Sequence, residues 1–100
     1  MEKLKAHYVL QDIQAVVLRD GGRAFTFAVQ RGAESMGLSR AEVLGVVLSL
    51  TGRMFYKSMT TYADNTVWQD VYHAPCPNGK IAYIKLTMQA GAVVIQFKEK

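Results

Sequence analysis

The hydrophobic period of the chain changes once, near Gly52, and this change limits the possible folds more than any other feature. Before Gly52 the apolar side chains recur every three or four residues, as in helices. After it, apolar and polar side chains alternate in segments separated by turn-forming residues, which is typical of strands. With only 100 residues, the chain predicts one α+β domain over residues 1–100, with N-terminal helices packed on one face of a mainly antiparallel sheet.

The helix immediately before Gly52 is the best marked. Ser39 and Glu42 form a capping box, in which each side chain can accept a hydrogen bond from the other residue's backbone N–H. Leu38 can pack on Val43 as a hydrophobic staple, and the residues that follow are apolar around most of the helix. We therefore expect a helix buried against the sheet that runs to about residue 50 or 51 and stops at Gly52.

Two amphipathic helices are expected earlier in the chain. The first covers about His7–Arg19 and stops at the glycine pair 21–22, where a positive φ costs little. Thr26 can cap the second helix, which continues to about Met36. Gly32 lies inside this second helix and weakens it by about 1 kcal/mol relative to alanine.

Four strands are expected in the second half, with short connections between them. They lie near Arg53–Met59, Thr66–Ala74, Lys80–Met88 and Ala92–Lys98. The connections contain polar residues, two prolines and an Asn-Gly pair, which favour hairpins. Consecutive hairpins predict an antiparallel meander, and such a sheet can leave one face open to solvent or to a ligand.

Strand alternation predicts which side chains lie on this open face. In the third expected strand Tyr83 and Lys85 alternate with an apolar set that suits the helix-covered face. The last strand has the same pattern, and polar positions of the first two strands can point the same way. The expected open face carries Lys57, Gln69, Tyr83, Lys85, Gln96 and Lys98.

The charge of the chain suits a phosphate-bearing ligand. The 12 Lys and Arg residues exceed the 8 Asp and Glu residues, which gives a formal net charge of +4. Residues 1–50 contribute +1 and residues 51–100 contribute +3, so the excess lies in the strand half. Lysines neutralise phosphates, amides read base edges and tyrosine can stack on a base, so the open face resembles an RNA-binding surface. Each lysine equally fits a solvated strand position, and Tyr83 fits ordinary sheet packing.

The sequence gives little support to a secreted disulfide-bonded protein, a membrane protein, a metalloprotein or a triad hydrolase. Cys76 is the single cysteine and can form no internal disulfide. No apolar run is long enough for a membrane span, and no secretory signal develops at the start. These observations favour a reducing, cytoplasmic location. His73 and Cys76 form an isolated pair that falls short of a zinc ligand set, so no metal and no cofactor are expected. Ser58, Asp70 and His73 do not indicate a catalytic triad, because nothing places the serine on a nucleophile turn.

Three segments resemble the MqsR-type toxins: Phe55–Tyr62, Val67–Tyr72 and Phe97–Lys100. The resemblance implies a RelE-like fold and the toxin component of a bacterial type II toxin–antitoxin system, an endoribonuclease that cuts mRNA at GCU-type sites and blocks translation. It also implies a cognate antitoxin, encoded nearby, that contains zinc and binds DNA. The sequence departs from the family after Tyr72, where loop 73–79 lacks the expected basic pattern, so substrate preference can differ.

The resemblance assigns Lys57, Gln69 and Tyr83 to catalysis. In RNA the 2′-hydroxyl can attack the adjacent phosphorus, so the protein needs only to orient groups, move protons and stabilise charge. We expect Lys57 to stabilise the phosphorane, Gln69 to position phosphate or base, and Tyr83 to transfer a proton or orient a phosphate oxygen. The RNA itself is expected to contact Lys85, Lys98, Gln96 and His73. His73 is a second candidate for acid–base chemistry, and a non-catalytic module that binds RNA or docks a partner is the alternative.

Overall fold

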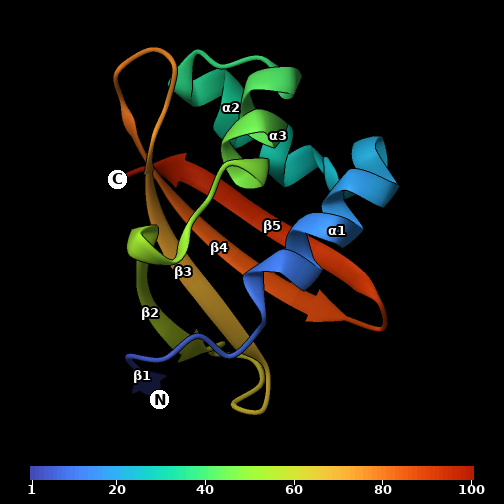
Figure 1. The fold of residues 1–100 in the computed structure, drawn as a ribbon, viewed down its shortest axis with the longest axis vertical. Helices are drawn as coiled ribbons and strands as arrows, with labels where there is room; N and C mark the ends of the chain where they lie inside the picture. The colour runs from blue at the N-terminus through green and yellow to red at the C-terminus, as the bar shows by residue number, and fades with distance from the viewer.

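A computed structural model describes residues 1–100 as three helices on one face of a five-stranded sheet (Figure 1). The helices are α1 (Leu10–Asp20), α2 (Phe27–Met36) and α3 (Arg40–Leu48). The strands are β1 (Glu2–Lys3), β2 (Phe55–Thr60), β3 (Trp68–Pro75), β4 (Ile81–Gln89) and β5 (Ala92–Glu99). All strand pairs are antiparallel and lie in the order β1-β2-β3-β4-β5. The predicted α+β class is confirmed.

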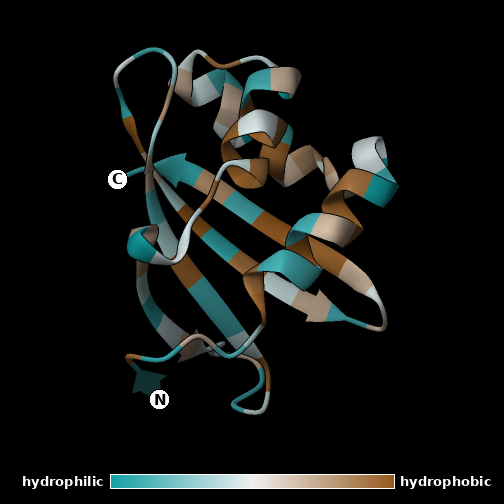
Figure 2. Ribbon diagram, in the orientation of Figure 1, coloured by the Kyte–Doolittle hydropathy of each residue, from teal (hydrophilic) through white to brown (hydrophobic).

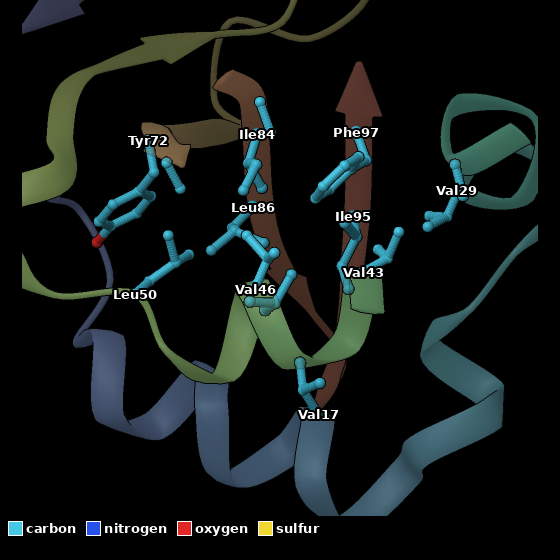
Figure 3. Close-up of a cluster of buried hydrophobic side chains, with 14 of the residues drawn as sticks. Val17, Val29, Val43, Val46, Leu50, Tyr72, Ile84, Leu86, Ile95 and Phe97 are labelled. Carbon is cyan, nitrogen blue, oxygen red and sulfur yellow. The ribbon is translucent and has the colours of Figure 1, made fainter. Parts of the chain in front are cut away.

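The core fills the space between the helices and one face of the sheet. Figure 2 shows hydrophilic and hydrophobic bands alternating along β3, β4 and β5, as expected for strands with one covered face. In Figure 3, Val43 and Val46 of α3 point toward Ile84, Leu86 and Ile95 of the sheet. Leu38, Val43 and Val46 are all buried, and the Ser39–Glu42 capping box is present with both of its hydrogen bonds.

Helix α3 ends at Leu48, about two residues before the predicted end. The side-chain amide of Gln14, on α1, donates hydrogen bonds of 3.0–3.2 Å to the carbonyls of Val47, Leu48 and Leu50. Val47 and Leu48 lie in the last turn of α3, where carbonyls lack ordinary intrahelical partners, and Leu50 lies just past the helix. Gln14 of α1 therefore supplies hydrogen-bond donors to the carbonyls at the C-terminal end of α3. The chain then turns through a short 3₁₀ helix, Gly52–Met54, into β2.

Strand β1 is an element that the sequence did not predict. It has only two residues, too few for an alternation pattern, and pairs Glu2 with Met59 and Lys3 with Ser58 at the β2 edge. Because the sheet would otherwise end at β2, this short strand covers part of an exposed edge. It also brings the start of the chain beside Lys57.

Gly32 lies where the backbones of α2 and β5 approach each other closely. A Cβ atom at this position would collide with the backbone carbonyl of Phe97. The glycine that weakens α2 as a helix therefore allows the helix to lie against the backbone of the last strand. By contrast, a Cβ atom at Gly45, on the exposed side of α3, would have no atom within 4 Å.

This contrast predicts opposite effects for two glycine-to-alanine changes. Gly32→Ala should lower the free energy of unfolding by about 2 kcal/mol, because the added methyl group forces α2 away from β5. Gly45→Ala should raise it by up to about 1 kcal/mol, because alanine is the better helix former and meets nothing. Denaturant unfolding measures both, and equal effects of the same sign would show that the close approach is wrong.

Candidate active site

The strand register brings the predicted site residues to the sheet face opposite the helices. Tyr83 lies opposite His73 on β3 and opposite Lys98 on β5. Lys85 lies opposite Gln96, and both Lys57 and Lys85 lie opposite Val71. Directly opposed residues point to the same side of a sheet. The open face therefore contains Lys57, Gln69, His73, Tyr83, Lys85, Gln96 and Lys98.

Three aromatic rings cross this face from β2 to β4, and we call Tyr56, His73 and Tyr83 the aromatic row. The rings of Tyr56 and His73 are stacked, with centroids 4.4 Å apart, and those of His73 and Tyr83 lie 5.4 Å apart. The ammonium of Lys98 lies 5.1 Å from the Tyr83 ring and that of Lys85 lies 6.0 Å from it. Cations at this distance from a ring are attracted to its π-face, so the row and the lysines form one group.

Tyr56 is a member of this row that sequence reasoning missed. The β2–β3 register shifts between Phe55 and Lys57, which indicates a bulge at Tyr56. Phe55 consequently packs edge-on against the buried Tyr72, with ring centroids 5.6 Å apart, while Tyr56 lies on His73 at the other face. The available signal was that Phe55 and Lys57 need opposite faces although they are two residues apart, which strict alternation forbids.

Lys57 is held by an acidic residue of β1. Its ammonium lies 2.8 Å from a carboxylate oxygen of Glu2, and the Lys57 side chain is 19% exposed whereas that of Glu2 is 58% exposed. This hydrogen bond is the main cause that raises the pKa of Lys57 and lowers the pKa of Glu2. Lys57 is therefore positively charged at neutral pH and aimed along the open face beside Glu2. Sequence reasoning also missed Glu2, because β1 was not expected.

His73 lies at the centre of the open face, and both its hydrogen bonding and its pKa are unusual. Its Nε2 atom is buried and has no hydrogen-bond partner. Burial, and after it the positive charge of Lys100, lowers the pKa of His73 below its ordinary value of 6.5. The imidazole is thus neutral at neutral pH, although it lies among lysines and tyrosines.

Two hollows flank the centre of the face. Tyr83, Lys85, Gln96 and Lys98 line one of about 220 Å³, together with Ala28 and Phe97. The other, of about 310 Å³, lies beside the β2–β3 loop. It is lined by Thr61, Ala63, Asp64, Val67, Gln69, Thr87, Gln89 and Val94. Gln69 and Tyr83 therefore belong to different hollows, with Val71 and Lys57 between them in the register.

The buried carboxylate of Asp70 fixes the N-terminal segment on the opposite face. It accepts hydrogen bonds from the backbone N–H of His7 at 3.0 Å and of Tyr8 at 2.9 Å, and from the hydroxyl of Ser58 at 2.6 Å. Because these backbone groups bind Asp70, α1 begins at Leu10, later than predicted. Figure 1 shows the segment running past the end of the β2–β3 hairpin before it enters α1.

Trp68 supports the same segment. The His7 ring stacks on Trp68 with centroids 5.4 Å apart, and the ammonium of Lys3 lies 4.1 Å from the Trp68 ring. Alternation along Trp68-Gln69-Asp70 thus sends Gln69 to the open face and its two neighbours to the N-terminal segment. Trp68 therefore packs against the N-terminal segment.

The structure groups no three His, Cys, Asp or Glu side chains in a way that could hold a metal ion. Cys76 is buried, and burial raises the pKa of its thiol. None of the helices combines the length and the apolar character needed to cross a bilayer.

Comparisons with known proteins agree on one family. Residues 5–99 match the family described as "Motility quorum-sensing regulator, toxin of MqsA". The chain is also similar to a protein of Escherichia coli (strain K12) named "mRNA interferase toxin MqsR". The two are 36% identical over 100 residues, which cover 100% of each chain.

Asp70→Ala should strongly destabilise the fold. The change leaves two backbone N–H groups and the Ser58 hydroxyl without their acceptor, so we expect the free energy of unfolding to fall by about 3 kcal/mol or more. Asp64→Ala is the matched control, because Asp64 is exposed and its hydrogen bonds stay within the β2–β3 loop. Denaturant unfolding should show a clearly smaller loss for the control, and similar losses would contradict the role of Asp70.

Glu2→Gln should lower the pKa of Lys57 toward 10.5, because the substitution removes the carboxylate that stabilises the ammonium. An NMR titration of the lysine side chains measures this. Glu99→Gln serves as the control, because Glu99 pairs with Lys80 at 3.7 Å and should leave the titration of Lys57 unchanged. An unchanged Lys57 titration in Glu2→Gln would rule out the pair in solution.

Proposed function

The chain belongs to the MqsR toxin family, and from this membership we propose that it is an mRNA interferase toxin, an endoribonuclease whose open face cuts mRNA. The single observation that supports the location of the site is the meeting of Lys57, Tyr83 and Lys98 around the aromatic row on one uncovered sheet face. These residues come from three strands, and the antiparallel register alone brings them together.

The chemistry needs no protein nucleophile, because the RNA supplies its own. Attack of the 2′-oxygen on the adjacent phosphorus leaves a 2′,3′-cyclic phosphate and a 5′-hydroxyl. The negative charge that develops on the phosphorane needs a fixed cation, and Lys57 is charged, partly buried and held in place by Glu2. Gln69 can position a phosphate or a base with its amide, and the Tyr83 hydroxyl can transfer a proton or orient a phosphate oxygen.

The two hollows suggest how a single strand of RNA lies on the protein. Lys85, Gln96 and Lys98 line one hollow and would hold the backbone by charge and hydrogen bonds. Gln69 lines the other hollow on the far side of Lys57. An RNA strand that occupies both would pass over the register positions of Lys57, Val71 and Lys85. The aromatic row borders this path at its Tyr83 end, where a base can stack on an exposed ring.

The family description implies a partner as well as a substrate. The matching family consists of toxins of MqsA, so we infer that this chain has a cognate antitoxin. We extend the family resemblance to an antitoxin that contains zinc and binds DNA, to a cytoplasmic site of action and to GCU-type cleavage sites. The zinc belongs to the partner, and the α+β architecture agrees with the RelE-like fold that the resemblance implies.

Substitutions of the catalytic residues test the proposed site. Purified wild-type protein should cut an RNA with GCU sites into discrete products with 2′,3′-cyclic phosphate ends, and an RNA without GCU should be cut more slowly. Lys57→Ala should lower the single-turnover rate by about 10²–10³-fold, because it removes a fixed charge at the phosphorane. Gln69→Ala and Tyr83→Phe should lower it by smaller factors.

Lys80→Ala is the matched control for lost positive charge, because Lys80 is exposed outside the open face and pairs with Glu99. Its rate should equal that of wild type. A Lys57→Ala rate within a few-fold of wild type would reject the assigned role. RNA that is retained but not cut by wild type would instead support a non-catalytic binding module.

A further inference from the structure

The open face contains one group whose ordinary pKa lies near neutrality. The chain has two histidines, and His7 lies on the other side of β3, against Trp68. The remaining titratable groups of the open face are tyrosines and lysines, apart from Glu2, which is paired with Lys57. Tyrosine and lysine side chains have reference pKa values of about 10, so they are already protonated in neutral solution and have no free site for the proton of a substrate. His73 is therefore the distinctive acid–base group of this face.

The position of His73 suits a role in the reaction. It lies on the central strand, between Tyr56 of β2 and Tyr83 of β4, and two residues along β3 from the position opposite Lys57. Its buried Nε2 has no hydrogen-bond partner in the protein. Buried polar atoms are almost always paired, so an unpaired one at a candidate site calls for an explanation. Tyr56 covers the imidazole and is itself 48% exposed, so its side chain is free to turn aside when RNA binds.

On the basis of the proposed RNA cleavage, we propose that His73 is the general base of this chain and takes the proton of the attacking 2′-hydroxyl on Nε2. As the 2′-oxygen forms its bond to phosphorus, the bond from phosphorus to the 5′-oxygen breaks. The departing 5′-oxygen takes the hydroxyl proton of Tyr83, whose ring lies near the ammonium groups of Lys85 and Lys98. Solvent then removes the proton from His73 and returns one to Tyr83, which restores both groups.

The surroundings of His73 keep its imidazole deprotonated, and therefore able to accept a proton. Tyr56 and Lys57 face it from β2, Tyr83 and Lys85 from β4, and Lys98 from β5, with Lys100 just beyond this strand. These neighbours are neutral or cationic, and both burial and Lys100 lower the pKa of His73. A base must be deprotonated to act, so activity should fall on the acid side, with a midpoint below pH 6.5.

The experiment compares pH–rate profiles of single-turnover cleavage for wild type, His73→Asn and His73→Phe. We expect both variants to lose about 10²–10⁴-fold in rate at neutral pH and to lose the acid limb that wild type shows below pH 6.5. His73→Phe keeps a ring between Tyr56 and Tyr83, so its thermal stability and its affinity for a 2′-O-methyl RNA of the same sequence should stay close to wild type. His7→Asn, on the other face, should keep the wild-type rate and profile.

The outcomes separate this inference from the function on which it depends. If wild type yields no cyclic-phosphate ends, the proposed function fails. If wild type cuts RNA and His73→Asn stays within a few-fold of it with the same acid limb, His73 is not the base and the function stands. If His73→Phe weakens binding of the 2′-O-methyl RNA by the same factor as the rate, His73 serves RNA binding, and the proton-transfer role is rejected.

Discussion

The carboxylate of Asp70 binds donors from two distant parts of the chain, and the arrangement of the site depends on it. A buried charge is costly unless hydrogen bonds replace its water, and the donors here are the backbone of His7 and Tyr8 and the hydroxyl of Ser58. The N-terminal segment satisfies the carboxylate, and the carboxylate in turn fixes the segment. This anchor lets β1 pair with β2, and β1 carries the glutamate that holds Lys57.

The three residues Trp68-Gln69-Asp70 consequently serve two faces of the sheet at once. Gln69 belongs to the open face, while its neighbours hold the N-terminal segment on the other. Substitutions at these three adjacent positions should therefore have different phenotypes. Changes at Trp68 or Asp70 lower the stability of the fold, and they alter the position of Lys57 only by loosening β1. A change at Gln69 leaves the hydrogen bonds of Asp70 to the N-terminal segment intact. Activity data for this motif must be read together with unfolding data.

The sequence predicted the helices, the main strands and the composition of the open face because each depends on local pattern: a capping box, a period of two and short turns. It missed Tyr56, because a bulge moves that residue to the other face without changing the composition of the strand. It missed Glu2, because a two-residue strand has no period and forms only where a distant edge is free. Gly32 was recognised as a weak helix position, but its reason, the nearby backbone of Phe97, is a tertiary contact.

The position of Trp68 makes the two faces separately observable. It is the single tryptophan of the chain, and its ring packs against Lys3 and His7, which contact each other, turned away from the open face. Its intrinsic fluorescence should therefore report attachment of the N-terminal segment and stay nearly constant while RNA binds across the sheet. Detachment of that segment, a local opening that leaves the core intact, would appear as an optical signal that precedes global unfolding. The chain thus carries a built-in optical probe of the N-terminal segment, whose Glu2 holds Lys57.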